Sequence, residues 1–399
     1  MFSIRAIRID DLEEARRQLT ANGCDPAGIK IMEKKAVFMT VKLEKLPAKA
    51  ANLLKQTFLA KGGEVAVARG TADLSIEYTD VLICATLKQY QLALTQLKLQ
   101  PWGLPEVAAA IEKALNHHLQ FPTRLYRWQD RELELKAGRT LIMGILNLTP
   151  DSFSDGGRFN SVNAAVEHVQ AMVEHGADII DIGAESTRPY GAQPISAEEE
   201  MERLLPVLEK VLPHCPVPIS IDTYKARVAE AALQMGAHVI NDVGGLQQDP
   251  EMAKVVAKYK APVVIMHNQK TTAYQGDIIS EIVTFIQRSM AIGIAAGISP
   301  DRFIVDPGIG FGKNTEQNLE VLARLAELKV LGCPILLGTS RKRFIGETLD
   351  LPVNEREEGT AATVAYGICN GANIVRVHDV KSMARVVRMI DAIRGKGNK

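Results

Sequence analysis

The sequence of 399 residues lacks three features that would assign it to a specialised class of protein. Its five cysteines are scattered, without a CxxC pair or close Cys/His spacing, which argues against a zinc site and a disulfide framework. Its 47 basic and 47 acidic residues balance, so nothing in the charge favours nucleic acid or an anionic membrane as a partner. No apolar run approaches the ~20 residues of a membrane span, and charge comes too early at the N-terminus for a secretory signal. We therefore expect a soluble, cytoplasmic protein that holds any anionic ligand through a local cluster.

Downstream of residue 137, a short apolar segment followed by an amphipathic segment recurs along the chain. The apolar segments predict strands at 140–146, 178–183, 217–222, 238–242, 262–266, 302–306, 334–338 and 373–378. Helical spacing of apolar residues predicts helices at 162–173, 196–212, 225–235, 249–259, 277–297, 315–331, 357–370 and 380–394. Continuous Ile, Val and Leu runs indicate strands buried on both faces. Eight such pairs in about 250 residues predict an α/β fold of the (β/α)8 TIM-barrel type. A doubly wound open sheet is the alternative, but it would not so naturally place polar residues at every strand end.

A smaller α+β domain is predicted for residues 1–122. Its strands are expected at 2–8, 29–42, 64–69 and 80–86, and its helices at 10–22, 47–62, 87–97 and 104–118. Residues 123–137 are expected to form a linker with a short hairpin, and residues 138–399 the barrel. The N-terminal domain carries no motif that indicates a chemical role.

Polar residues follow the predicted barrel strands, at the end where barrel enzymes carry their active sites. One group suits an oxyanion such as phosphate, because arginine supplies a planar fork of donors. Its members are Arg188, Arg376 and His378, with Thr187 and Asn147. A second group suits a flat heterocycle with an amino-amide edge, because carboxylates accept from ring N–H and NH₂ groups and lysine donates to a carbonyl. Its members are Asp222, Asn241, Asp306 and Lys342. Together the groups predict a nitrogen heterocycle that carries a phosphate ester.

Simpler interpretations of the same residues remain open. An Asp or Asn after a strand is more often a helix N-cap than a ligand, so Asp222 and Asn241 could be caps. His267 and His378 could be structural, and for His267 this is the favoured interpretation. The glycines of 308–312 lack the spacing of a P-loop and do not open a dinucleotide-binding unit.

The ordered motifs resemble those of the dihydropteroate synthase family over roughly residues 138–395. They are MGILNLTPDSFSDGG at 143–157, ESTRP at 185–189, SIDT at 220–223, IND at 240–242, DPGIGFGK at 306–313, SRK at 340–342 and RVH at 376–378. The resemblance implies condensation of 6-hydroxymethyl-7,8-dihydropterin diphosphate with 4-aminobenzoate to give 7,8-dihydropteroate and pyrophosphate. It also implies Mg²⁺, with Asn147 as the protein ligand, and inhibition by sulfonamides.

The resemblance also implies roles for individual residues. Asp222, Asp306, Lys342, Arg376 and His378 are the catalytic set. The expected substrate contacts add Thr187, Arg188, Asn241, Met266, Phe311, Gly338, Phe153 and Pro189. Within this set, Asp222, Asn241, Asp306 and Lys342 hold the pterin, and Arg376 lies on its face. The diphosphate falls to Thr187, Asn147, Arg376 and His378, and the aminobenzoate pocket to Phe153, Pro189 and Lys342.

Two residues depart from the commonest family pattern, and other functions compete with the synthase. Tyr190 separates Pro189 from Gly191, and Arg343 follows Lys342 where many members have serine. Arg343 could pair with the aminobenzoate carboxylate or face solvent. A methyltetrahydrofolate–corrinoid methyltransferase shares the barrel but needs no diphosphate site. A non-catalytic pterin-binding paralogue would be expected to have lost Asn147, Lys342 or Arg376. A homodimer formed through outer helices is expected.

Overall fold

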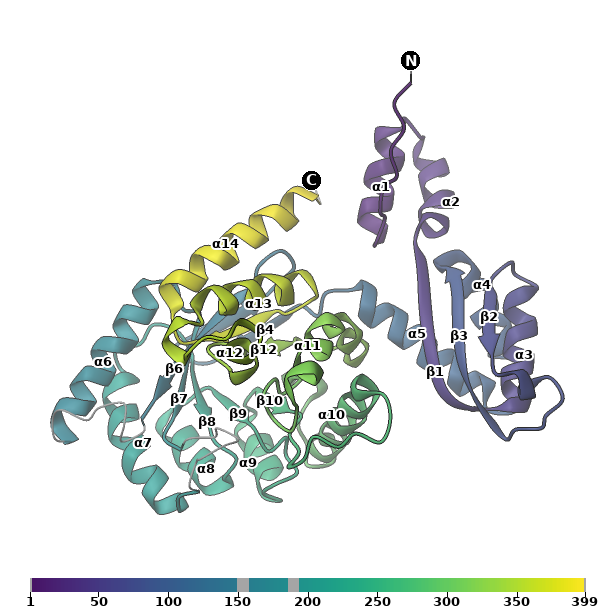
Figure 1. Ribbon diagram of the computed structural model, residues 1–399. Coiled ribbons are helices and arrows are strands. Elements are labelled where there is room, and N and C mark those ends of the chain that lie inside the picture. The colour runs from purple at the N-terminus through teal and green to yellow at the C-terminus, as the bar shows by residue number, and fades with distance from the viewer. Residues whose placement is uncertain (1, 149–157, 186–193, 398–399) are drawn as a thin grey trace. The chain divides into compact units, whose positions relative to one another are not determined.

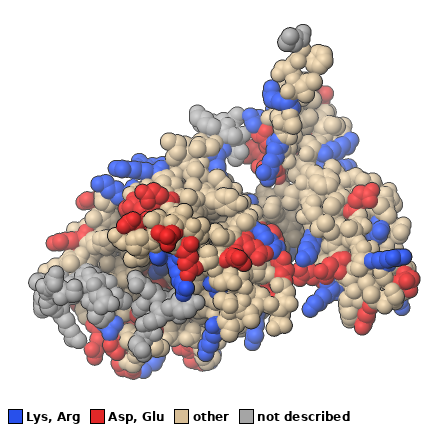
Figure 2. Space-filling model, viewed as in Figure 1, with Lys and Arg blue, Asp and Glu red and all other residues tan. Residues whose placement is uncertain are grey.

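The computed structural model describes residues 2–148, 158–185 and 194–397. The chain divides into two compact units. One is Met1–Gln120 with Gly395–Lys399, and the other is Phe121–Arg394. In Figure 2 basic and acidic side chains are interspersed on the face in view, in keeping with their equal numbers in the sequence.

The N-terminal unit packs helices on a small antiparallel sheet. The strands are β1 (Phe38–Pro47), β2 (Glu64–Val67) and β3 (Tyr78–Thr86), in the spatial order β1-β3-β2. The helices are α1 (Leu12–Ala21), α2 (Pro26–Ala36), α3 (Ala48–Leu59), α4 (Leu87–Leu97) and α5 (Leu104–Leu119). The core forms where alternate residues of β3, such as Ile83, meet α3 and α4 through Phe58 and Tyr90. The two rings contact edge to face at 5.3 Å.

Of the strands predicted in this unit, the one at 2–8 was wrong and the one at 29–42 is a strand only from Phe38 onward, where β1 begins. Residues 29–42 are helical in their first half, because α2 begins at Pro26 and continues to Ala36. Asp25 caps this helix by accepting from the backbone N–H groups of Ala27 and Gly28, and proline suits the first helical turn. Residues 2–8 lie in no helix and in no strand of the sheet, and Phe2 is 85% exposed. Apolar and polar residues alternate at 2–8 as in a strand, but this segment pairs with no described strand.

The larger unit is a parallel barrel with helices around it (Figure 1). Its strands are β6 (Leu141–Asn147), β7 (Ile179–Gly183), β8 (Ile219–Asp222), β9 (Val239–Asp242), β10 (Val263–Met266), β11 (Phe303–Asp306), β12 (Leu336–Leu337) and β13 (Ile374–Val377). The spatial order β11-β10-β9-β8-β7-β6-β13-β12 follows the chain around the barrel. A parallel bridge between Val305 and Ile335 joins the two ends. The TIM-type fold is thus confirmed, and the open doubly wound sheet is excluded.

The surrounding helices mostly follow the predicted positions. They are α6 (Arg158–Glu174), α7 (Ala197–Val211), α8 (Ala226–Met235), α9 (Met252–Tyr259), α10 (Ile278–Ala295), α11 (Thr315–Ala323), α12 (Arg343–Leu349), α13 (Glu357–Cys369) and α14 (Val380–Gly397). The short α12 was not predicted. The helix expected at 315–331 breaks at Arg324, and a 3₁₀ segment, η4 (Leu325–Leu331), follows it. Leu325, Leu328 and Leu331 are buried, and their spacing of three fits the 3₁₀ period.

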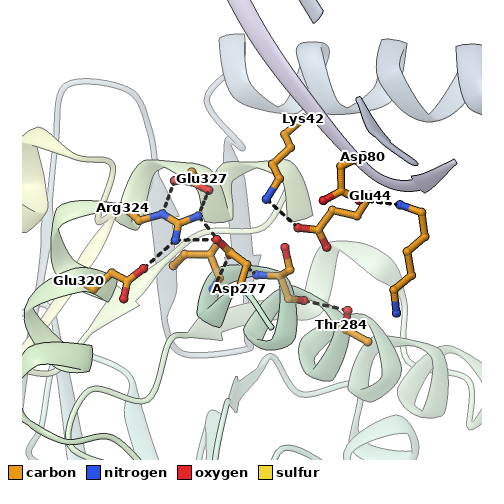
Figure 3. Close-up of polar contacts among 11 residues, drawn as sticks. Lys42, Glu44, Asp80, Asp277, Thr284, Glu320, Arg324 and Glu327 are labelled. Atoms are coloured by element: carbon orange, nitrogen blue, oxygen red, sulfur yellow. Dashed lines mark hydrogen bonds and ion pairs between the residues drawn. The ribbon is translucent and has the colours of Figure 1, made fainter. Parts of the chain in front are cut away.

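Helix α10 is apolar enough, by length and composition, to resemble a membrane span. It is a core helix of the barrel instead, since Ile279, Ile282 and Ile286 pack into the main hydrophobic cluster. Its N-cap, Asp277, pairs with Arg324 at 2.8 Å. Figure 3 shows Arg324 between this carboxylate and those of Glu320 and Glu327, so the break after α11 is tied to the start of α10.

A hairpin closes the amino-terminal end of the barrel. Its strands are β4 (Arg124–Arg127) and β5 (Glu132–Leu135), which pair in antiparallel fashion. Tyr126, Leu133 and Leu135 form a separate buried cluster with the first inward residues of the barrel strands, such as Met143. The Tyr126 hydroxyl donates to the carbonyl of Asp301 at 3.1 Å. Arg131, in the turn, donates to the carbonyls of Leu212 and Cys215.

We predict that Tyr126→Ala lowers the free energy of unfolding by about 3–5 kcal/mol, because it leaves a cavity among the inward residues of the barrel. Urea unfolding of the full chain measures this change. The control is Leu125→Ala on the same strand, where the side chain is 44% exposed and a change below about 1 kcal/mol is expected. Equal effects of the two variants would show that the hairpin does not fill the barrel end.

Candidate active site

The pleat of the barrel strands turns one residue at each strand end toward the barrel axis. Residues such as Ile221, Ile240 and Val305 belong to the cluster beneath the outer helices. Their neighbours in the strands therefore point inward. At the carboxyl end the inward positions are Asn147, Asp222, Asn241, Met266, Asp306, Gly338 and Arg376. The structure thus brings together these sequence-predicted residues, from strands far apart in the chain, at one end of the barrel.

Arg376 spans the interior and joins three strands. Its Nε donates to Asp181 Oδ2 at 2.6 Å, and its Nη2 donates to Asp222 Oδ2 at 2.8 Å. Asn241 Nδ2 donates to the same oxygen of Asp181 at 3.0 Å. The buried guanidinium therefore offsets two buried carboxylates, and the amide of Asn241 is oriented by one of them.

Three polar atoms in this network have no hydrogen-bond partner among the described residues. They are Asp181 Oδ1, Asp222 Oδ1 and Ser220 Oγ, all inaccessible to solvent. A buried acceptor without a partner costs about 1–3 kcal/mol. A ligand that brought N–H groups to these oxygens would recover that energy, which makes them candidate acceptors for a donor-rich molecule.

Asp306 and Lys342 lie on the other side of the opening. Asp306 Oδ1 accepts from the backbone N–H of Gly308 at 2.7 Å. The Lys342 ammonium donates to the carbonyl of Ile309 and lies 5.0 Å from the centre of the Phe311 ring. Lys342 is the residue that precedes α12, and this short helix fixes its backbone.

The electrostatics follow from the burial of these groups. Burial raises the pKa of Asp222 to about 7, although Arg376 opposes the shift. Burial also raises the pKa of Asp306, against the attraction of Lys342. The same cause lowers the pKa of Lys342 to about 8, with Asp306 opposing it. The pKa values of Asp222 and Lys342 therefore lie near neutrality, where a change in ligand charge can alter the protonation of either group.

His378 lies just beyond β13. Its Nδ1 is 2.9 Å from the hydroxyl of Ser340, which also accepts from the His378 backbone N–H. This pairing links the end of β13 to the loop after β12, which carries Lys342.

Asp222, Asn241 and His267 differ in how they fit the simpler interpretations. Helix α8 begins at Ala226 after Lys225, so Asp222 is not its N-cap. Asp242, rather than Asn241, stabilises the following turn, by accepting from the N–H groups of Gly244 and Leu246. His267 is buried, and its Nδ1 lies 2.9 Å from Lys313 Nζ, as a structural histidine would be.

Several expected residues fall outside the described part of the chain, namely Phe153, Thr187, Arg188 and Pro189, together with Tyr190. Arg343 is described. Its side chain is 67% exposed and pairs with Glu347 one helical turn away, so of its two expected positions the structure shows the solvent-facing one.

Asp181 was missed by the sequence reasoning. It occupies the inward parity of β7, two positions before Gly183, and that parity alone could have indicated it. Among the described residues, no three His, Cys, Asp or Glu side chains gather as metal ligands. Lys313, also not predicted, is buried beside Asp306.

We predict that Arg376→Met lowers the free energy of unfolding by about 3–5 kcal/mol at pH 8, because it leaves Asp181 and Asp222 buried without their counter-ion. The raised pKa of Asp222 means that this carboxyl favours the folded state when protonated, a contribution lost as pH rises through about 7. Removing Arg376 raises that pKa further. The loss of stability should therefore be smaller at pH 5 than at pH 8.

Thermal unfolding between pH 5 and pH 9 tests this expectation. The control is Arg227→Met, which removes an exposed ion pair with Glu198 and should cost less than about 1 kcal/mol at any pH. A penalty for Arg376→Met that does not depend on pH would mean that the carboxylates are not held by this arginine.

Comparison with known proteins assigns the family. A family model described as "Pterin binding enzyme" matches residues 143–378, more than half of the chain. The dihydropteroate synthase of Bacillus subtilis is 51% identical over 259 residues, which are 65% of this chain and 90% of that protein. The probable bifunctional folylpolyglutamate synthase/dihydropteroate synthase of Halobacterium salinarum is 38% identical over 392 residues. That match covers 97% of this chain and 46% of that protein, so it includes most of the N-terminal unit.

Solved structures give the same result over the barrel. A dihydropteroate synthase from Clostridium difficile, crystallised in the presence of pteroic acid, has a TM-score of 0.63 and 53% identity, covering 64% of this chain and 97% of that one. The enzyme from Xanthomonas albilineans in complex with 7,8-dihydropteroate has a TM-score of 0.62 and 38% identity, covering 68% and 99%. Together with the fold, these matches show that the chain belongs to the dihydropteroate synthase family of pterin-binding enzymes, and is therefore a transferase.

Proposed function

We propose that the chain condenses 6-hydroxymethyl-7,8-dihydropterin diphosphate with 4-aminobenzoate, which gives 7,8-dihydropteroate and pyrophosphate. Relatives with 38–53% identity over the barrel have been crystallised with pteroic acid and with 7,8-dihydropteroate. The observation in this chain that carries the proposal is the pair of buried carboxylate oxygens without a partner, on Asp181 and Asp222.

A pterin ring supplies what these oxygens lack. Its amino-amide edge carries adjacent N–H and NH₂ donors, and Asp222 Oδ1 is an acceptor for them. Asn241 can accept through its amide oxygen, since its amide nitrogen already donates to Asp181. Lys342 donates to the ring carbonyl, and Arg376 stacks its planar guanidinium on the ring face. Met266 and Gly338 line the same opening without adding charge.

The chemical step follows from the same charges. The bond between the pterin methylene and the diphosphate oxygen breaks, and the electron pair leaves with the diphosphate. Positive charge then spreads from the methylene into the electron-rich ring, where Asp222 and Asp306 stabilise it. The amine of 4-aminobenzoate attacks the methylene and afterwards loses a proton. This route needs neither a covalent nucleophile nor a general base in the protein.

We assign the leaving diphosphate to Arg376 and His378, with Thr187 and Arg188 from outside the described residues. The Nδ1 of His378 lies 2.9 Å from the hydroxyl of Ser340, which orients the ring at the end of β13. The aminobenzoate pocket is assigned to Phe153, Pro189 and Lys342, with Phe311 beneath the ammonium of Lys342. Sulfonamides should compete with aminobenzoate for this pocket.

The residues present fit a magnesium ion of the expected kind. Asn147 is the inward residue at the end of β6 and offers a neutral oxygen, while the nearby carboxylates of Asp181 and Asp222 are engaged by Arg376. Mg²⁺ accepts one protein oxygen readily, because water and phosphate oxygens complete its shell. When bound, it would supply positive charge to the diphosphate.

The remaining proposals concern the whole chain. We place the enzyme in the cytoplasm as a homodimer. The domain division is proposed as an accessory domain at 1–122, a connecting hairpin at 123–137 and a catalytic barrel at 138–399. If the protein had no synthase activity, the alternatives would be methyl transfer to a corrinoid and a binding function without catalysis.

Pyrophosphate release by the purified full chain tests the proposal. With dihydropterin diphosphate and Mg²⁺, release should depend on 4-aminobenzoate, and dihydropteroate should form in equal amount. Lys342→Ala should lower kcat/KM at least ~100-fold, since it removes a partly buried charged donor (about 3 kcal/mol). Lys254→Ala, an exposed lysine on α9, should leave the rate unchanged. Pterin binding without turnover would refute the synthase, and unchanged turnover in Lys342→Ala would refute the site.

The metal assignment makes a separate prediction. Asn147→Ala should raise the Mg²⁺ concentration required for half-maximal activity about 10-fold or more, because one oxygen of the ion's shell must then come from water. Titration of activity with Mg²⁺ after treatment with a chelator measures this requirement. An unchanged titration curve in Asn147→Ala would remove this residue as the ligand.

A further inference from the structure

Lys313 is a buried lysine that the proposed reaction does not use. Only 5% of its surface is exposed. Its Nζ is 2.9 Å from His267 Nδ1, 2.9 Å from the carbonyl of Gly308 and 3.0 Å from the carbonyl of Phe311. Burial lowers the pKa of Lys313 to about 7, so below that pH the side chain is an ammonium whose three N–H donors each meet one acceptor. The group is therefore fully engaged within the protein and has no donor left for a substrate.

The three acceptors belong to two different strand ends. His267 follows β10, whereas Gly308 and Phe311 lie in the loop that follows β11. This loop, residues 306–313, lies tightly against the end of β10. A Cβ atom at Gly308 would collide with the carbonyl oxygen of His267, and the positive φ of 69° there independently favours glycine. The ammonium of Lys313 fastens the loop at this point of close approach.

The same loop carries or places the groups assigned to the pterin. Its first residue is Asp306, whose Oδ1 accepts from the N–H of Gly308. The carbonyl of Ile309 accepts from Lys342, and the ring of Phe311 lies beneath the same ammonium. A displacement of residues 308–311 would thus move the carboxylate and the lysine that face the ligand.

We propose that Lys313 is a positioning residue, which locks the 306–313 loop onto the end of β10 and thereby sets the places of Asp306 and Lys342 in the pterin site. This proposal rests on the function proposed above for that site. The lock requires a neutral His267 whose Nδ1 accepts. Burial together with the charge of Lys313 lowers the pKa of His267 to about 3, so the ring is neutral across the working range.

Lys313 also acts on the charge of Asp306. The cations near this carboxylate are Lys342, Lys313 and Arg376, and each lowers its pKa against the effect of burial. Loss of the Lys313 charge should therefore let Asp306 take up a proton at higher pH. A purely structural role, limited to loop packing, would leave that titration where it is.

The test compares Lys313→Met with the wild-type full chain. Methionine keeps most of the volume and removes all three donors. The KM for dihydropterin diphosphate should rise ~10–100-fold, as expected for lost hydrogen bonds of a charged group. The KM for 4-aminobenzoate should rise by a smaller factor, because Lys342 serves both pockets whereas Asp306 serves the pterin alone. The acid limb of kcat/KM should shift to higher pH.

Two further variants separate positioning from general damage. His267→Gln keeps an acceptor for Lys313 and should retain most of the activity, whereas His267→Leu should reproduce part of the Lys313→Met defect. Lys258→Met, an exposed lysine, is the matched control and should behave as wild type. Equal KM values in Lys313→Met and wild type, or an unshifted acid limb, would overturn the proposal.

Hydrogen exchange makes the result independent of turnover. Amides of residues 308–312 should exchange at least 10-fold faster in Lys313→Met than in wild type, while those of the β4–β5 hairpin stay protected. Calorimetry with pteroic acid then reports the site without the reaction. Faster exchange and weaker pteroic acid binding would support the positioning role even if the wild-type chain released no pyrophosphate. Unchanged exchange would contradict it even if the synthase activity were established.

Discussion

The site depends on the closure of eight short parallel strands, most of only four residues, into a barrel. Closure forces every second residue of each strand toward one axis, so each strand end contributes one side chain to a shared space. Polar residues from sequence positions more than 200 apart, such as Asn147 and Arg376, thereby come to one mouth without any local contact. The outward residues, which are apolar apart from Asp242 at the end of β9, attach the same strands to the helices. One geometric constraint thus separates the residues that stabilise the fold from those that bind.

The charged residues at the carboxyl end of the barrel provide binding capacity at the expense of the stability of the protein. Asp181, Asp222 and Asp306 are buried carboxylates beside the partly buried Lys342 and Arg376, and one oxygen each of Asp181 and Asp222 has no partner among the described residues. Such groups destabilise a protein that has no ligand. The burial that raises the pKa of Asp222 toward neutrality also strengthens its attraction for a cation formed in the pocket. The burial of these charged groups therefore both favours ligand binding and lowers the stability of the protein without a ligand.

Most of this arrangement was predictable from the sequence. The barrel strands are short apolar runs that recur along the chain, and the polar residues of the site lie at or directly after their carboxyl ends. What was missed has local physical causes. The Asp25–Pro26 cap outweighed the strand-like pattern of residues 29–35, and leucines spaced by three turned 325–331 into a 3₁₀ segment. Asp181 was overlooked although its parity matches the other inward residues. Lys313 could not be recognised, since its partner His267 is distant in sequence and only the folded barrel brings them together.

The hairpin at the amino-terminal end of the barrel limits where ligands can enter and leave. Tyr126, Leu133 and Leu135 fill the interior at that end, beneath the layer that holds Met143 and Ile304. The barrel is therefore closed at its amino-terminal end. A ligand must therefore enter and leave at the carboxyl end of the barrel, so the two substrates and the two products use the same opening. A molecule bound deepest in such a barrel would have to enter before, and leave after, any molecule bound above it, whatever their separate affinities.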